Sequence, residues 1–406
     1  MSSAAPGNRF RVGVNYWPAR TAMSWWSQFD RAEVAADFAR IAASGLDSVR
    51  IFLSWEDFQP APSEIDPEML ERLVQVADLA AEHGLALVPT LFTGHMSGVN
   101  WIPPWALGGS DGDDRFRVIS HGKITHTGLR NWYSDPTVAD AQALLAAEAA
   151  AALRGHEAIW MWDLGNENSN CVIPLNRASA CAWLARLSAA IRGADDNALV
   201  TVGLHMEDLE EDRRLGPSEA SESCDLLSMH GYPIYAPWSE GATDDQLVPF
   251  LARVTCWLGN GREVLFSEFG LPTHRRGDSS QGKARGDSTL LVDEDAAAVY
   301  TASTLEGLRR AGCSGAMLWC YSDYLPALWE SPPFDLAPHE CTFGLWRDDG
   351  SPKPSVGAVA AFVGAERCAV GQADEWIDID RDEFQRAPKT HMPRLYRRYR
   401  DSRRAT

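Results

Sequence analysis

The sequence predicts an α/β fold: a single (β/α)8 TIM barrel over residues 8–365, followed by a charged C-terminal extension, residues 366–406. Two observations lead to this prediction. Eight short apolar segments recur along the chain, and polar, amphipathic segments separate them. This alternation is typical of a parallel sheet covered by helices. Eight strands with such spacing close most naturally into a barrel, in which functional residues lie at the C-terminal ends of the strands.

The expected strands are nearly continuous apolar runs, as in strands that are covered on both faces. They show little of the polar and apolar alternation that marks a strand with one solvated face. The expected ranges are Val12–Trp17, Ser48–Ser54, Ala86–Phe92, Ala158–Leu164, Leu199–Leu204, Leu226–His230, Glu263–Ser267 and Gly315–Trp319.

Four of the intervening helices have recognisable features. Gly45 is a natural C-terminal glycine for the first of them. Asp66 is a suitable N-cap for the second, with proline at the first helical position. The third is rich in Ala and Leu, which favour helix strongly. The expected ranges are Glu33–Ala43, Pro67–Glu82, Ala139–Leu153 and Ala296–Arg310.

Three segments are too long to be simple connectors: Thr93–Pro136, Tyr232–Thr243 and Pro272–Asp293. Each follows an expected strand, so we expect all three to border the mouth of the barrel. Long loops in a compact domain are usually functional or mobile. The basic run Arg394–Arg400 near the C-terminus is expected to form a solvated helix or an arm that packs on an acidic protein.

The composition disfavours several classes of partner. Lys and Arg number 37 against 56 Asp and Glu, a net charge of −19, which disfavours nucleic acid and anionic membrane surfaces. No signal peptide or run of about 18 apolar residues is visible, so we expect a cytoplasmic protein that does not span a membrane. The eight scattered cysteines are expected to be free thiols. The sequence leaves the oligomeric state open.

Two glutamates stand where apolar runs end. Glu167 follows the fourth expected strand in Asn166-Glu167-Asn168, and Glu268 follows the seventh in Ser267-Glu268-Phe269. Either residue alone is more often a helix cap or a solvated loop residue. The pair is more specific, because opposite strands of a barrel can hold two carboxyl groups about 5–5.5 Å apart. That arrangement suits cleavage of a glycosidic bond, with one group protonated and the other ionised.

With these motifs the sequence resembles clan A of the glycoside hydrolases, and family 5 in particular, over roughly residues 10–360. The resemblance implies a retaining O-glycoside hydrolase. Glu167 would be the acid/base and Glu268 the nucleophile. Asn166 would bind the 2-hydroxyl of the sugar.

Further positions match the family in strand order. The resemblance implies that Arg50 keeps the nucleophile ionised, that Tyr232 lies close to the nucleophile, and that His230 lies near the acid/base. Trp319 would form the platform for the sugar next to the scissile bond. Each has a structural alternative: Arg50 as a barrel ion pair, His230 as a core histidine, Trp319 as a filler of the barrel mouth. The matches together favour the functional interpretation.

Aromatic residues and histidines at the barrel mouth are further candidates for substrate contact. Tryptophan planes stack on the apolar faces of sugars, and the chain has 16 tryptophans, of which Trp17 and Trp101 are our first choices. His95 is expected to line the cleft, as the histidine after the third strand does in many family 5 enzymes. His121 and His126 share its loop, but zinc-binding spacings are absent. We expect no metal and no cofactor.

Two segments are similar to β-mannanases: His230-Gly231-Tyr232-Pro233 with Trp238, and Asn131–Pro136. Asn168 replaces the proline that mannanases carry after Asn-Glu, which argues against action on polymer. We therefore expect an exo-acting β-mannosidase on short β-1,4-linked manno-oligosaccharides or mannosyl-N-acetylglucosamine. The alternatives are an endo-β-1,4-mannanase or endo-β-1,4-glucanase with an open cleft and, from another class, a catalytically silent carbohydrate-binding barrel.

Overall fold

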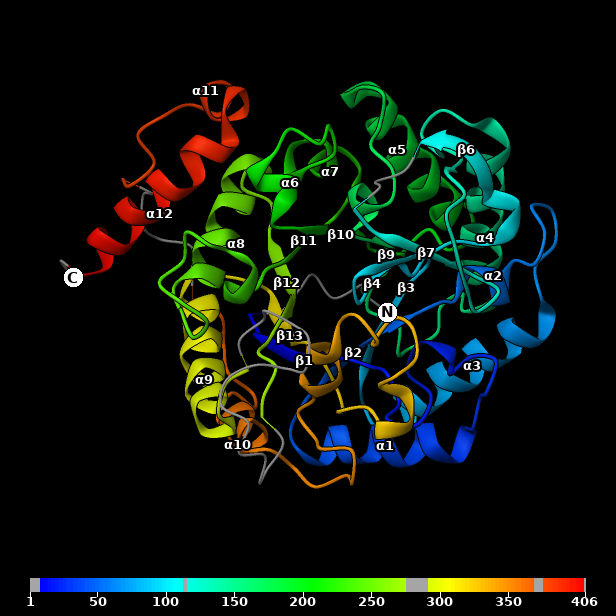
Figure 1. The fold of residues 1–406 in the computed structure, drawn as a ribbon, viewed down its shortest axis with the longest axis horizontal. Coiled ribbons are helices and arrows are strands. Elements are labelled where there is room, and N and C mark those ends of the chain that lie inside the picture. Colours follow the sequence, from blue (N-terminus) through cyan, green and yellow to red (C-terminus); the bar gives the residue numbers. More distant parts are fainter. Residues whose placement is uncertain (1–7, 112–114, 275–290, 369–374, 405–406) are drawn as a thin grey trace.

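Eight parallel strands form a closed barrel, and the major helices surround it (Figure 1). The computed structural model describes residues 8–111, 115–274, 291–368 and 375–404. The strand order β1-β13-β12-β11-β10-β9-β3-β2 confirms the predicted (β/α)8 barrel. The barrel strands are β1 (Arg11–Asn15), β2 (Ser48–Phe52), β3 (Ala86–Thr90), β9 (Trp162–Asn166), β10 (Val200–His205), β11 (Leu227–His230), β12 (Val264–Phe269) and β13 (Gly315–Leu318).

The fourth barrel strand differs from the expected range, Ala158–Leu164. At its expected start the backbone bonds to β3, since Trp160 donates to the Leu87 carbonyl at 2.9 Å. Trp162 donates instead to the Leu199 carbonyl, beside β10, at 2.8 Å. The continuous strand therefore begins only at Trp162 and ends at the Asn-Glu pair.

The helices begin where side chains satisfy their free N–H groups. Asp66 accepts hydrogen bonds from the second and third residues of α3, as its position predicts. Asp135 caps α4 in the same way, so that helix begins at Pro136, before the expected Ala139. The outer helices are α1 (Arg31–Ala43), α3 (Pro67–Glu82), α4 (Pro136–Ala152), α5 (Arg177–Ala194), α7 (Pro217–Ser223), α8 (Leu247–Leu258), α9 (Glu294–Arg310) and α10 (Pro354–Ala360).

The segment after β3 contains a small sheet of its own, with the strand order β4-β5-β7-β8. Its strands are β4 (Gly94–Met96), β5 (Val99–Trp101), β7 (Arg117–Ser120) and β8 (Lys123–Thr125). We call it the third-loop sheet. It covers one side of the barrel mouth. Of the third long segment, Pro272–Asp293, residues 275–290 lie outside the described residues.

The basic C-terminal run forms helix α12 (Pro388–Arg404), which lies outside the barrel beside α8 (Figure 1). Its apolar face is buried. The Tyr396 ring lies 5.0 Å from that of Phe250, and its hydroxyl donates to Asp244 at 2.6 Å. The charged face remains at the surface, where Arg394 pairs with Asp378. The arginine-rich segment is therefore an amphipathic helix packed on the barrel.

The sequence also leads to expectations about the cysteines and about membrane-spanning helices. All eight cysteines are described, and all are free thiols. Within the ranges given above, none of the helices combines the length and apolar character needed to traverse a bilayer.

Gly94 allows the third-loop sheet to approach the end of β9. Its φ is +58°, and an added Cβ would lie 2.5 Å from the Asn166 carbonyl oxygen. Gly84 has a similar φ of +66°, but an added Cβ there would meet no atom within 4 Å. A substitution at Gly84 therefore introduces backbone strain alone, whereas one at Gly94 introduces both backbone strain and a steric clash.

We expect Gly94→Ala to lower the free energy of unfolding by at least about 1 kcal/mol more than Gly84→Ala. Both variants place alanine in the left-handed region, at roughly 1–2 kcal/mol each. Only Gly94→Ala adds a clash with backbone, which destabilises by roughly 1–3 kcal/mol. Urea unfolding of the two variants and the wild type measures this difference. Equal losses would show that the β4–β9 approach is not tight.

Candidate active site

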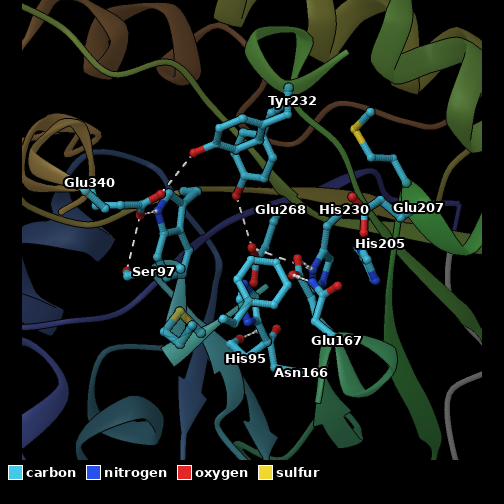
Figure 2. Close-up of a pocket in the computed structure, with 18 of the residues that line it drawn as sticks. His95, Ser97, Asn166, Glu167, His205, Glu207, His230, Tyr232, Glu268 and Glu340 are labelled. Carbon is cyan, nitrogen blue, oxygen red and sulfur yellow. Dashed lines mark hydrogen bonds and ion pairs between the residues drawn. The ribbon is translucent and has the colours of Figure 1, made fainter. Parts of the chain in front are cut away.

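The C-terminal ends of the barrel strands surround a cavity of about 360 Å³ (Figure 2). A cavity of this size lies within the range that small-molecule ligands occupy. Seven of the residues that the sequence singles out line it: His95, Asn166, Glu167, His230, Tyr232, Glu268 and Trp319. Arg50 lies directly behind Glu268, fully buried in the barrel.

Glu167 and Glu268 converge in this cavity. One carboxylate oxygen of each and one ring nitrogen of His230 all lie within 4.8 Å of one another. Carboxyl groups that flank a glycosidic bond at about 5–5.5 Å are typical of retaining glycosidases, whereas inverting enzymes separate them by about 6.5–9.5 Å. The geometry of the pair therefore fits retention.

Glu268 is held by two donors. Arg50 Nη1 lies 2.5 Å from one carboxylate oxygen, and the Tyr232 hydroxyl donates to the other at 3.0 Å. Arg50 also binds Asp163, with Nη2 to Oδ2 at 2.6 Å. One buried cation thus bridges two anions. Both donors favour the ionised form of Glu268, the form that a nucleophile requires.

Glu167 has a different environment. It follows β9 with a left-handed φ of +48°. His230 Nδ1 lies 2.9 Å from one of its oxygens, and Asn170 Nδ2 donates to the other at 3.1 Å. Arg213 in turn donates to Asn170 Oδ1 at 2.8 Å, which holds that amide toward Glu167. Asn170 and Arg213 are supports that no sequence pattern indicated.

The surroundings separate the pKa values of the two carboxyl groups. Burial and the negative charge of Glu268 raise the pKa of Glu167 well above its ordinary value. Burial also raises the pKa of Glu268, but the charge and hydrogen bonds of Arg50 and the Tyr232 hydroxyl oppose that effect. A proton shared by the pair therefore resides on Glu167. Burial lowers the pKa of His230, which keeps its ring neutral.

Asn166 links the two halves of the site. Its Oδ1 accepts from Arg50 Nη2 at 2.8 Å, and its Nδ2 donates to the His95 carbonyl at 2.5 Å. The His95 ring is fixed by Asn100, with Nδ1 to Oδ1 at 2.8 Å. Both side chains line the cavity, where the resemblance to family 5 places them.

Trp17 and Trp101, our first choices among the tryptophans, do not line the cavity. Trp17 is buried and stacks on Phe52, with ring centroids 4.8 Å apart. Phe52 also contacts Trp319, so it separates Trp17 from the cavity wall. Trp101 directs its Nε1 to the Met96 carbonyl at 3.2 Å. Both rings therefore contact other residues of the protein instead of the cavity.

Several residues of the wall were not indicated by the sequence. His205 is the last residue of β10, and the others lie in two short helical elements. These are α6 (Glu207–Glu210), which contributes Glu207 and Glu210, and the turn Pro338–Thr342 after β13, which contributes His339 and Glu340. Their only signal is position, because each lies at the end of a barrel strand or between that strand and the next outer helix.

One group of three side chains in the described ranges is close enough to hold a metal ion, and it consists of Glu167, His230 and Glu268. Arg50 already compensates the charge of Glu268 there. The same three groups suit proton transfer and nucleophilic attack, in which an ionised carboxylate and a protonated one face one bond.

Comparisons with known proteins point to one family. The family model "Cellulase (glycosyl hydrolase family 5)" matches residues 8–320. The chain is similar to the exo-β-1,4-mannosidase Op5Man5 of Opitutaceae bacterium strain TAV5, at 28% identity and TM-score 0.70. That match covers 88% of this chain and only 60% of the other. A GH5_18 structure from Streptomyces cattleya in complex with Manβ1-4GlcNAc is 22% identical, with TM-score 0.77, covering 96% of this chain and 90% of that one.

A curated relative comes from Oryza sativa subsp. japonica, putative mannan endo-1,4-beta-mannosidase 9. It is 21% identical over 351 residues, which cover 78% of this chain and 80% of the relative. The family match extends over most of the chain and includes both strand-end glutamates. The chain therefore belongs to glycoside hydrolase family 5, and it is a retaining glycoside hydrolase.

Proposed function

We propose that this chain is an exo-acting β-mannosidase that hydrolyses short β-1,4-linked manno-oligosaccharides or mannosyl-N-acetylglucosamine. The observation that carries the proposal is that side chains of the third-loop sheet contact the segment after β13 beside the catalytic cavity. We infer that these contacts close one end of it. A closed end admits the last sugar of a chain and excludes a continuous polymer.

Two contacts make this closure. The Ser97 hydroxyl, between β4 and β5, donates to Glu340 Oε2 at 3.2 Å. Arg117 of β7 forms a bidentate pair with Asp335, with nitrogen–oxygen distances of 2.8 and 3.0 Å. Both contacts join the third-loop sheet to the segment after β13. Bidentate pairs of this kind fix geometry as well as contribute energy.

The side chains that border the opposite end of the cavity are more exposed. Figure 2 shows Ser97 and Glu340 on one side of Glu268, and Glu207 on the other. Ser97 and Glu340 are only 7% and 8% exposed. On the far side Arg115 bonds to Glu207 and to Asn170, and the side chains of Arg115 and Glu207 are 45% and 33% exposed. Exposed ion pairs hold segments together weakly, so we place the leaving group at the Glu207 end.

The relatives support a mannoside as substrate. The Opitutaceae protein is named as an exo-β-1,4-mannosidase, and the Streptomyces cattleya structure contains Manβ1-4GlcNAc. The Oryza relative is named as an endo-acting mannan enzyme, which keeps endo-β-1,4-mannanase as the second candidate. The closed end of the cavity favours the exo-acting alternative.

In the proposed cycle Glu268 attacks the anomeric carbon while Glu167 donates its proton to the departing oxygen. The sugar–oxygen bond breaks, and an ester forms between the sugar and Glu268. That ester removes the charge that raised the pKa of Glu167, so Glu167 can then accept a proton from water. The water attacks the anomeric carbon and releases the sugar with retained configuration.

A substrate panel tests the proposal. We expect p-nitrophenyl β-mannoside to be hydrolysed with a higher kcat/KM than the corresponding β-glucoside. Mannobiose and mannosyl-N-acetylglucosamine should be cleaved faster than mannan polymer, because the closed end excludes internal segments. Chromatography of products over time measures both. Rapid release of mixed oligosaccharides from mannan would support the endo-acting alternative.

The pH dependence tests the two roles. Attack needs ionised Glu268, so kcat/KM should fall as the pH decreases through its pKa. Proton donation needs protonated Glu167, so kcat/KM should also fall as the pH rises through the pKa of that group. On an aryl mannoside with a good leaving group, Glu167→Ala should lower the second step at least about tenfold and remove the alkaline limb of the profile.

Glu210→Gln is the matched control. Burial raises the pKa of Glu210, another carboxyl group on the cavity wall, to about 6. We expect that variant to keep the alkaline limb. An alkaline limb that persists in Glu167→Ala, or that disappears in Glu210→Gln, would assign the acid to a different group.

A further inference from the structure

Glu340 is a third carboxylate in the catalytic cavity, separate from the pair that faces the scissile bond. It lies in the short helical turn Pro338–Thr342 after β13 and lines the cavity. Its oxygens accept three hydrogen bonds, from Trp319 Nε1 at 3.2 Å, the Ser97 hydroxyl at 3.2 Å and the Tyr235 hydroxyl at 3.1 Å. Segments that follow three barrel strands, β3, β11 and β13, thus converge on one side chain.

The charge of Glu340 is poorly compensated for a buried group. Across the described ranges, no Lys or Arg nitrogen lies within 4.0 Å of its carboxylate, and the nearest ionisable nitrogen is His339 Nε2 at 3.5 Å. Burying a carboxylate is unfavourable unless hydrogen bonds satisfy it. An ionised carboxylate can accept about four, and the three protein donors leave capacity for another donor from the cavity.

The need to orient the Trp319 indole does not explain why a carboxylate lies at this position. A neutral amide oxygen could accept the indole N–H without burying a charge. A carboxylate accepts a hydroxyl proton more strongly than an amide does, because charge-assisted hydrogen bonds are roughly twice as strong. A sugar hydroxyl is the donor that the cavity of a glycoside hydrolase would supply.

The position of Glu340 in the cavity indicates which sugar of the substrate supplies that hydroxyl. It bonds to Trp319, the predicted platform of the sugar that Glu268 attacks, and it helps to close the end of the cavity away from Glu207 (Figure 2). We propose that Glu340 is a specificity-determining residue that accepts a hydrogen bond from a hydroxyl of the terminal sugar, on the side of the ring away from the scissile bond. This inference rests on the proposed function, since it takes the terminal sugar to occupy the closed end.

Deoxy sugars test the inference. We would measure kcat/KM of wild type and Glu340→Gln for p-nitrophenyl β-mannoside and its 3-, 4- and 6-deoxy analogues. In the wild type, loss of the bonded hydroxyl should lower kcat/KM roughly 10- to 100-fold. In Glu340→Gln the parent substrate should lose about tenfold or more, while the penalty for that one analogue shrinks toward unity. Equal penalties in both enzymes for all three analogues would overturn the proposal.

Asp37→Asn is the matched control. Asp37 is also 8% exposed and accepts hydrogen bonds from two tyrosine hydroxyls, those of Tyr16 and Tyr321, but it lies outside the cavity. Its variant should leave the deoxy penalties as in the wild type. Thermal unfolding of both variants reports any loss of folding separately.

An error in the proposed mannosidase function would give a result different from an error in the role of Glu340. If the wild type hydrolyses another β-glycoside and not the β-mannoside, the mannosidase assignment is wrong. The role of Glu340 is then tested with the deoxy series of the sugar that is turned over, and unchanged penalties there overturn it too.

Discussion

The site depends on one fully buried guanidinium. Arg50 lies between Asp163 and Glu268, with nitrogen–oxygen distances of 2.6 and 2.5 Å. A buried cation is tolerated only with such partners, and removal of one partner leaves an uncompensated charge. One positive charge between two negative ones favours ionised Glu268 while leaving the cavity acidic. That remaining negative charge is part of what keeps the proton on Glu167.

The fold holds this arrangement through short links between strands. Asn166 connects Arg50 to the third-loop sheet, since it accepts from the guanidinium and donates to the His95 carbonyl. Gly94 lets that sheet approach the end of β9. The third-loop sheet then reaches across to the segment after β13 through Ser97. The same elements therefore position Glu167, support Glu268 and contact one another across one side of the cavity.

Much of the barrel and its two glutamates could be predicted from the sequence, because continuous apolar runs mark buried strands and their ends mark the mouth. The third-loop sheet could not, since its strands are too short to show a period. The position of Trp17 outside the cavity lining could not be predicted, because strand-end position does not reveal that its ring stacks on Phe52. Glu340 lies in a segment without periodicity, so only the three-dimensional contacts reveal it.

Covalent trapping tests the central claim, that Arg50 holds Glu268 as the ionised nucleophile. The wild type would be incubated with 2-deoxy-2-fluoro-β-mannosyl fluoride and digested, and the labelled peptide identified by mass spectrometry. The account predicts a single glycosyl ester on Glu268, formed much more slowly in Arg50→Lys, whose point charge does not reproduce the guanidinium geometry. A label on Glu167 or on another residue would contradict it.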